Sequence, residues 1–222
     1  MVYFEKSLPA PECLAIEKSK SSGDYKCGNV LERLEGDFKN KCYICELKKP
    51  TTINVEHFIS HKGDIDLKFD WNNLFWSCAH CNNTKLAKYS NLLNCTKAVD
   101  NVETALEYKL NPFPHEMVEI NVRVQGNKVD ETRELLLEVY NGTTILKKLE
   151  AANLRNKLLN EIMEFQRNLQ KFYDNENTPD TEEYFLNLIK KQLSISSSFT
   201  AFKRWIVRNN KVLKGDLEQY FD

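Results

Sequence analysis

Four of the seven cysteines in this 222-residue chain form two C-x-x-C pairs, Cys42 with Cys45 and Cys78 with Cys81. Four thiolates in this doubled pattern form the tetrahedral ligand set that a structural Zn²⁺ prefers. A zinc ribbon usually leaves roughly fifteen to twenty residues between its pairs, whereas about thirty separate Cys45 from Cys78. That length accommodates a strand, a loop and a second strand. The sequence therefore predicts a zinc ion that joins the two ends of a small β-hairpin, and the alternative is four unrelated buried cysteines.

The other three cysteines, Cys13, Cys27 and Cys95, lack such spacing, and we expect them to be small buried residues without a partner. The sequence begins without the basic and apolar stretches of a signal peptide, and no apolar run is long enough to span a membrane. We therefore expect a cytoplasmic protein with reduced thiols and no disulfide framework.

The composition is that of a soluble globular protein, with 41% hydrophobic and 28% charged residues. The formal net charge of −1 does not indicate a nucleic-acid-binding protein. Phosphate contacts depend on the local potential, however, so a local basic surface could still bind nucleic acid.

Outside the cysteine-rich part, apolar residues recur mostly at helical spacing. We expect short strands over residues 53–58 and 73–78, followed by a short helix over 79–88. A further strand is expected within 115–129, where Val and Ile alternate with polar residues. The sequence thus predicts an α+β, mainly helical fold that contains one compact module. We expect an N-terminal helical segment, the module and a mostly helical C-terminal region, at residues 1–37, 38–95 and 96–222.

Four polar side chains accompany the cysteine pairs: Glu56 and His57 at the end of the first expected strand, Asn73 before the second, and Asn82 directly after the last cysteine. Histidine has a pKa suited to deprotonating water near neutral pH. Carboxylate and amide oxygens suit a hard cation such as Mg²⁺ or Mn²⁺. Hydrolysis of a phosphodiester needs both, although His57 could instead be a hydrogen-bonded core histidine.

These residues resemble a known motif. Cys42-x-x-Cys45, Glu56-His57, Trp71-x-Asn73-Leu74 and Cys78-x-x-Cys81-Asn82-x-x-Lys85 are similar to the HNH nuclease motif in its zinc-stapled ββα-metal form. The resemblance implies that His57 is the general base and that Glu56 and Asn82 hold one divalent metal ion. It also implies that Asn73 ties the loop and orients the histidine. The family more often has Asp at the position of Glu56 and His at that of Asn82.

Lys85 and Lys88 follow Asn82 by one and two turns of the expected helix, within reach of backbone phosphates, although solvated surface lysines are equally common. We expect His61 to be a polar loop residue and His80 to face solvent between two cysteines. Asp64, Asp66 and Asp70 are expected to form turns. The basic stretch 199–214, which contains Lys203, Arg204 and Arg208, could follow a nucleic-acid backbone or form a solvated helix face.

A wider layout resembles the HNH subunit of the Septu and retron-linked anti-phage systems. The stretches concerned are SLPAPECLAIEKSKSSGDY, DFKNKCYICE, VEHFISHKGD, DWNNLFWSCAHCN and TTILKKLEAANLRNKLLNE. Such nucleases work beside an SMC-like ABC ATPase, so the resemblance implies an ATPase-binding surface within residues 96–222. Likeness of layout alone does not establish function.

The first hypothesis is a metal-dependent HNH endonuclease in phage defence, with DNA favoured over RNA as the substrate. A zinc-stabilised module that binds nucleic acid or protein without catalysis is the second, and an RNA nuclease acting on tRNA is the third. A binding module has no need of Glu56, His57 and Asn82 at this spacing, which favours an enzyme.

Overall fold

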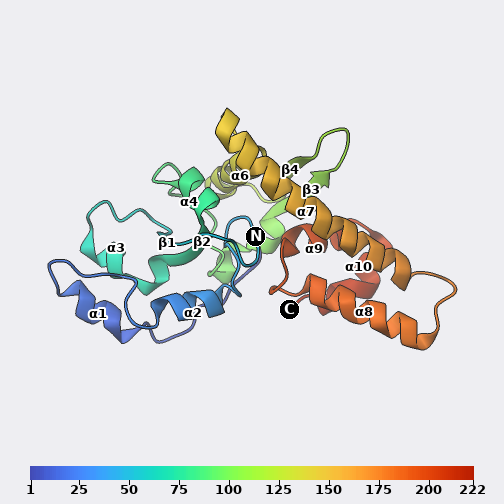
Figure 1. Ribbon diagram of the computed structural model, residues 1–222, viewed down its shortest axis with the longest axis horizontal. Coiled ribbons are helices and arrows are strands. Elements are labelled where there is room, and N and C mark those ends of the chain that lie inside the picture. The colour runs from blue at the N-terminus through green and yellow to red at the C-terminus, as the bar shows by residue number, and fades with distance from the viewer.

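In the computed structural model, which describes residues 1–222, the first C-x-x-C pair lies in a turn before a β-hairpin, and the second lies at the end of the hairpin and in the helix that follows it (Figure 1). The two strands pair antiparallel, with Ile53 opposite Cys78 and His57 opposite Leu74. The expected order of strand, strand and helix is therefore confirmed. The elements of this part are β1 (Ile53–His57), α3 (Ile65–Phe69), η1 (Trp71–Asn73), β2 (Leu74–Cys78) and α4 (Ala79–Lys85).

Strand β2 is buried along its whole length, because other parts of the chain cover both of its faces. Helix α2 (Val30–Asp37) packs against it, and the aromatic ring of Phe75 stacks on Phe58 with 4.8 Å between ring centroids. A strand covered on both faces is a continuous apolar run without alternation, which is the pattern of LFWSC in the sequence. The hairpin is therefore held inside the protein.

A second antiparallel pair lies beyond the module, β3 (Leu106–Asn111) with β4 (Met117–Val122). The sequence predicted β4, whose residues alternate between buried and exposed, but not β3. Strand β3 begins with three consecutive buried residues, Leu106, Glu107 and Tyr108, so it lacks the alternation that identifies a half-buried strand.

Helices make up most of the rest of the chain, as expected for a mainly helical α+β fold. Helices α7 and α8 lie against each other and extend away from the hairpin to form a second lobe (Figure 1). Thr178 caps α8 through a capping box with Thr181. The remaining helices are α1 (Glu12–Lys18), η2 (Ala98–Asp100), α5 (Val102–Ala105), α6 (Asn127–Asn141), α7 (Ile145–Phe172), α8 (Pro179–Leu193), α9 (Thr200–Arg208), α10 (Lys211–Leu217) and η3 (Glu218–Tyr220).

One apolar core connects all three expected segments. Its 42 buried residues run from Met1 through the hairpin and second sheet to Trp205, so the cysteine-rich module is embedded in the fold. A separate cluster of six buried residues fills the space between α7, α8, α9 and α10. None of the helices combines the length and apolar character needed to cross a membrane.

Two of the cysteines expected to be unpaired form a disulfide. Cys13 in α1 and Cys27 before α2 are joined, with their Cα atoms 6.0 Å apart, and only Cys95 is free and buried as predicted. The chain between them turns back on itself, which brings the two cysteines together. The expectation of no disulfide was therefore wrong, because spacing in the sequence does not reveal such a reversal.

The basic stretch near the end of the chain does not form a basic surface. It is divided into α9 and α10, and Lys203 and Arg204 are buried. The Lys203 ammonium pairs with Glu161 at 2.6 Å, and the Arg204 guanidinium pairs with Glu103 at 2.9 Å and Asp222 at 2.6 Å. The suggestion that this stretch follows a nucleic-acid backbone was therefore wrong for these two residues, since acids distant in sequence neutralise them.

We expect Arg204→Met to lower the free energy of unfolding by about 3 kcal/mol, because it removes the contacts of a buried guanidinium with two carboxylates and with the Leu193 carbonyl. The matched control is Lys214→Met, which removes an exposed pair with Glu218 and should cost less than about 0.5 kcal/mol. Urea denaturation of both variants measures the difference. Equal midpoints for the two would contradict a structural role for Arg204.

Candidate metal centre and active site

The four cysteines of the C-x-x-C pairs converge in one buried cluster. Their sulfur atoms all lie within 4.8 Å of one another, and the Cys45 and Cys78 sulfurs are 3.9 Å apart. A tetrahedral zinc ion with Zn–S bonds of about 2.3 Å would place its sulfurs about 3.8 Å apart. The cluster could therefore hold a metal ion, and the donor set fits zinc.

The turn that carries the first cysteine pair is fastened to the C-terminal helices. The hydroxyl of Tyr140 in α6 donates to the Cys45 carbonyl at 2.8 Å. The buried Glu46 carboxylate accepts from the Ala201 amide at 3.0 Å and pairs with the Lys41 ammonium at 3.6 Å. These contacts fix the turn that carries Cys42 and Cys45 against α6 and the start of α9.

His80, expected to face solvent, instead connects the second cysteine pair to two helices. Its Nδ1 lies 2.9 Å from the Glu150 carboxylate in α7, and its Nε2 donates to the Val139 carbonyl in α6 at 2.8 Å. Its side chain is only 15% exposed. The expectation was wrong because α6 and α7 cover this side of the cluster.

His57 lies at the end of β1, half-buried, with its ring held by a backbone group. Its Nε2 is 3.0 Å from the Lys68 carbonyl oxygen. A carbonyl only accepts, so Nε2 carries the proton and Nδ1 keeps its lone pair. Burial lowers the pKa of His57 below its usual value, and the hydrogen bond to Lys68 only partly opposes this. The ring is therefore neutral at neutral pH, with one nitrogen able to accept a proton.

Two aromatic rings flank His57. The Tyr25 ring lies edge-on to it with 4.6 Å between centroids, and the His61 ring lies edge-on at 4.7 Å. His61 also accepts the Gly63 amide at Nδ1, as fits the loop residue that the sequence predicts. Tyr25 could not be predicted from the sequence, because the loop between α1 and α2 brings it here.

Asn73 ties together the loop between β1 and α3. Its buried amide accepts from the Ile59 amide at 2.7 Å and donates to the carbonyls of Ile59 at 2.9 Å and Leu67 at 3.0 Å. Leu67 directly precedes Lys68, whose carbonyl holds His57. Asn73 therefore has the geometry of a residue that positions the histidine through the loop.

Glu56 and Lys85 form a buried ion pair on the other face of β1. The Glu56 Oε1 atom is 2.9 Å from the Lys85 ammonium, and both side chains are at most 5% exposed. The Lys85 ammonium also donates to the His57 carbonyl at 3.3 Å. Burial raises the pKa of Glu56 to about 7, and the charge of Lys85 opposes this shift. Lys85 thus points into the protein, away from any phosphate at the surface.

Asn82 and Lys88, the other polar residues singled out in this region, lie closer to the surface. Asn82 is half-exposed in α4, on the same face as Lys85 three residues later. The exposed Lys88 ammonium pairs with Glu138 at 2.8 Å. Lys88 could still reach a ligand from the surface, whereas Lys85 is held inside.

The donors expected for a catalytic divalent ion fit that role only in part. The Glu56 carboxylate is already neutralised by Lys85 in this arrangement, while Asn82 is accessible. The cysteine cluster is the only place where three or more metal-ligating Cys, His, Asp or Glu side chains meet. The geometry therefore supports a metal at the cysteines and does not fit Glu56 as an open metal ligand.

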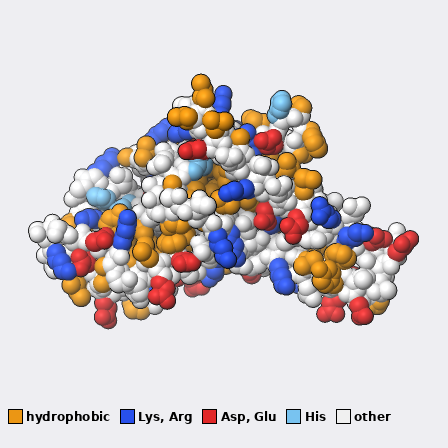
Figure 2. Space-filling view, viewed as in Figure 1, with side chains coloured by type: hydrophobic (Ala, Val, Ile, Leu, Met, Phe, Trp, Pro, Cys, Tyr) orange, Lys and Arg blue, Asp and Glu red, His pale blue; other side chains and the backbone are white.

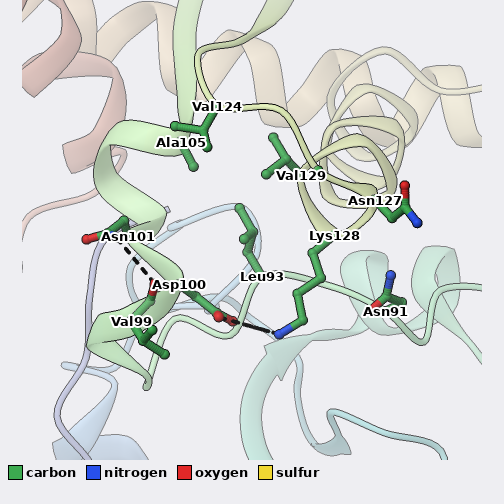
Figure 3. Close-up of a pocket in the computed structure, with 11 residues that line it drawn as sticks. Asn91, Leu93, Val99, Asp100, Asn101, Ala105, Val124, Asn127, Lys128 and Val129 are labelled. Atoms are coloured by element: carbon green, nitrogen blue, oxygen red, sulfur yellow. Dashed lines mark hydrogen bonds and ion pairs between the residues drawn. The ribbon is translucent and has the colours of Figure 1, made fainter.

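A groove of about 630 Å³ lies away from these residues, between the 91–101 loop and the start of α6 (Figure 3). Lys128 reaches across it to Asp100, with the ammonium 3.4 Å from the carboxylate, beside apolar Leu93 and Val129 (Figure 3). It contains none of the predicted site residues. This groove is therefore separate from the candidate site.

The face that carries α3 and β1 shows histidine side chains at the surface with basic side chains nearby (Figure 2).

No protein-family model matches this sequence, and no curated protein does. The function must therefore be argued from the site itself.

We expect the purified protein to contain one zinc ion per chain, measured by elemental analysis. Cys81→Ser should lose the metal and lower the melting temperature, because a structural zinc contributes directly to folding. Cys95→Ser is the matched control, since Cys95 is also buried and free but outside the cluster. Equal zinc content in the two variants would rule out the cluster as the binding site.

Asn73→Ala should lower the free energy of unfolding by about 2 kcal/mol, because the Ile59 amide and the carbonyls of Ile59 and Leu67 lose their side-chain partner. The neighbouring Asn72→Ala, at an exposed position, should change it by less than about 0.5 kcal/mol. Hydrogen exchange should also quicken over residues 59–67 in the first variant alone. Unchanged exchange there would show that Asn73 does not fix the loop.

Proposed function

We propose that this protein is an endonuclease of the HNH type that hydrolyses phosphodiester bonds in nucleic acid. The observation that carries the proposal is the hydrogen bond from His57 Nε2 to the Lys68 carbonyl, at the end of the first strand of a strand–strand–helix unit. It leaves Nδ1 free to take a proton from water.

In the proposed reaction, His57 accepts a proton from the attacking water at Nδ1 and becomes an imidazolium. The Lys68 carbonyl then stabilises the positive charge, because it already accepts from Nε2. Asn73 keeps that carbonyl in place through its hydrogen bond to the adjacent Leu67. The three residues together supply an oriented general base.

A divalent cation, Mg²⁺ or Mn²⁺, would neutralise the phosphate and the departing oxygen when bound. Asn82 offers an accessible oxygen for it. We assign no step of the reaction to Glu56, because its carboxylate pairs with the Lys85 ammonium. This ion pair instead holds the end of β1 against α4. The cysteine cluster, in this proposal, holds a structural zinc that fixes the hairpin.

DNA is the favoured substrate, and a role in anti-phage defence beside an SMC-like ABC ATPase rests on the resemblance of layout alone. An exposed apolar group at the start of α7 is a candidate contact for such a partner (Figure 2). Its residues are Ile145, Leu146 and Leu149, which are 82%, 75% and 62% exposed. Co-purification with a neighbouring ATPase, lost on Leu146→Asp, is the test of this contact.

His57→Ala should lower the cleavage rate at least about 100-fold, the usual contribution of a general base. The measurement uses plasmid DNA and total tRNA, each with Mg²⁺ or Mn²⁺ and with or without the ATPase. The matched control is His115→Ala, which removes an exposed histidine in the loop between β3 and β4 and should keep the parent rate. Circular dichroism and zinc content should not differ among the three proteins.

The two substrates separate the alternatives. If the parent cleaves DNA and His57→Ala does not, the protein is a DNA nuclease. If the parent cleaves only tRNA and His57→Ala does not, the substrate is RNA. Equal cleavage by His57→Ala and the parent would reject the assignment of the base. Binding of nucleic acid without cleavage by any protein would favour the zinc-stabilised binding module.

A further inference from the structure

The loop between α1 and α2 brings Tyr25 to the candidate base. The Tyr25 and His57 rings lie 4.6 Å apart between centroids with 68° between their planes, an edge-on contact. The Cys13–Cys27 disulfide closes this loop two residues after Tyr25. One side of His57 is therefore covered by a segment that a covalent bond holds in place.

Few other contacts hold the Tyr25 end of the loop. The residues next to Tyr25 are exposed, and the Lys26 amide bonds only locally, to Asp24. The other end is anchored at Gly23, whose carbonyl accepts from the Lys68 ammonium at 3.0 Å. A Cβ at Gly23 would lie 1.9 Å from the Glu17 carbonyl oxygen, so the close approach there requires glycine.

The same loop also contacts the segment whose carbonyl accepts from His57. Lys68 provides both the ammonium that bonds to Gly23 and the carbonyl that accepts from His57 Nε2. Helix α1 packs against α3, and Lys18 pairs with Asp66. A movement of the loop would therefore change both contacts that fix the imidazole.

The Cys13–Cys27 disulfide is partly exposed to solvent, so a dissolved thiol can reach it. Cys13 and Cys27 are both partly exposed, whereas the four cysteines of the metal cluster are buried. Exposed disulfides are the ones most open to thiol exchange. In compartments that keep thiols reduced, disulfides that do form are mostly transient and regulatory.

We propose that Tyr25 is a positioning residue for His57 and that the Cys13–Cys27 disulfide is a redox switch for this position. When the bond is closed, the Tyr25 ring and the Lys68 carbonyl both hold the imidazole in place. A dithiol reductant opens it: the disulfide takes two electrons and two protons to give two thiols, and the dithiol becomes a disulfide. The loop then releases Tyr25. The effect on cleavage rests on the proposed function, but the effect on His57 does not.

The first test is the NMR spectrum of the histidine side chains in the oxidised parent and in variants. Tyr25→Ala and the double variant Cys13→Ser/Cys27→Ser should both shift and broaden the His57 ring signals. Tyr25→Phe keeps the ring and should leave them at the parent position. Tyr184→Ala, which removes an exposed tyrosine in α8, is the matched control and should leave them unchanged. His57 signals that are identical in the parent and the double-serine variant would overturn the proposal.

The second test adds a dithiol to the parent and to the double-serine variant, with zinc content measured in both. The reductant should move the parent's His57 signals to those of the double variant, reversibly, and leave the double variant unchanged. An equal response of both proteins would place the effect at the metal cluster and reject the switch.

Cleavage rates measured on the same samples separate this inference from the proposed function. We expect the reduced parent and Tyr25→Ala to cleave about tenfold more slowly than the oxidised parent, as fits a base displaced by a fraction of an ångström. If the His57 signals move as expected and no sample cleaves nucleic acid, the positioning stands and the nuclease proposal fails. If cleavage is present and unaffected by reduction, the switch fails and the nuclease proposal stands.

Discussion

The convergence of four buried thiols is the constraint on which the hairpin depends. Two of them come from a turn before β1, one from the end of β2 and one from the first turn of α4. A two-stranded hairpin alone is at best marginally stable in water, so its ends must be tied by something stronger than backbone hydrogen bonds. A metal among the thiols would do this, and Tyr140 and His80 extend the attachment to the C-terminal helices.

The candidate site lies at the end of β1, in the hairpin that the cysteine cluster holds in place. The side chains of residues 56 and 57 point to opposite faces of β1 and make different contacts there. Glu56 pairs with Lys85 inside, whereas His57 stays near the surface with one nitrogen bonded to a backbone carbonyl. A buried pair of opposite charges contributes more to a fixed arrangement than to stability, because both ions lose their hydration. In this protein it fixes the strand end that carries the histidine.

The sequence predicted local structure well where one short pattern determines it. The spacing of the cysteines predicted the cluster, and the short apolar runs predicted β1 and β2. The roles of His57, Asn73 and Asn82 were also read from the sequence, and they stay predictions. Apart from the missed strand β3, the errors concern contacts between distant segments. Three features depend on how the elements pack: the Cys13–Cys27 bond, the acids that pair with the buried Arg204, and the inward orientation of Lys85. The spacing of residues in the sequence does not reveal this packing.

Helix α7 takes part in both hydrophobic cores. Leu154, Leu158 and Ile162 belong to the large core around the hairpin, while Phe165 and Leu169 belong to the small core of the second lobe. At 28 residues this helix is about 42 Å long. Six buried side chains are too few for an independent unit, so the second lobe is ordered only while the shared helix is intact. The two lobes therefore melt as one cooperative unit, although they look separate in outline.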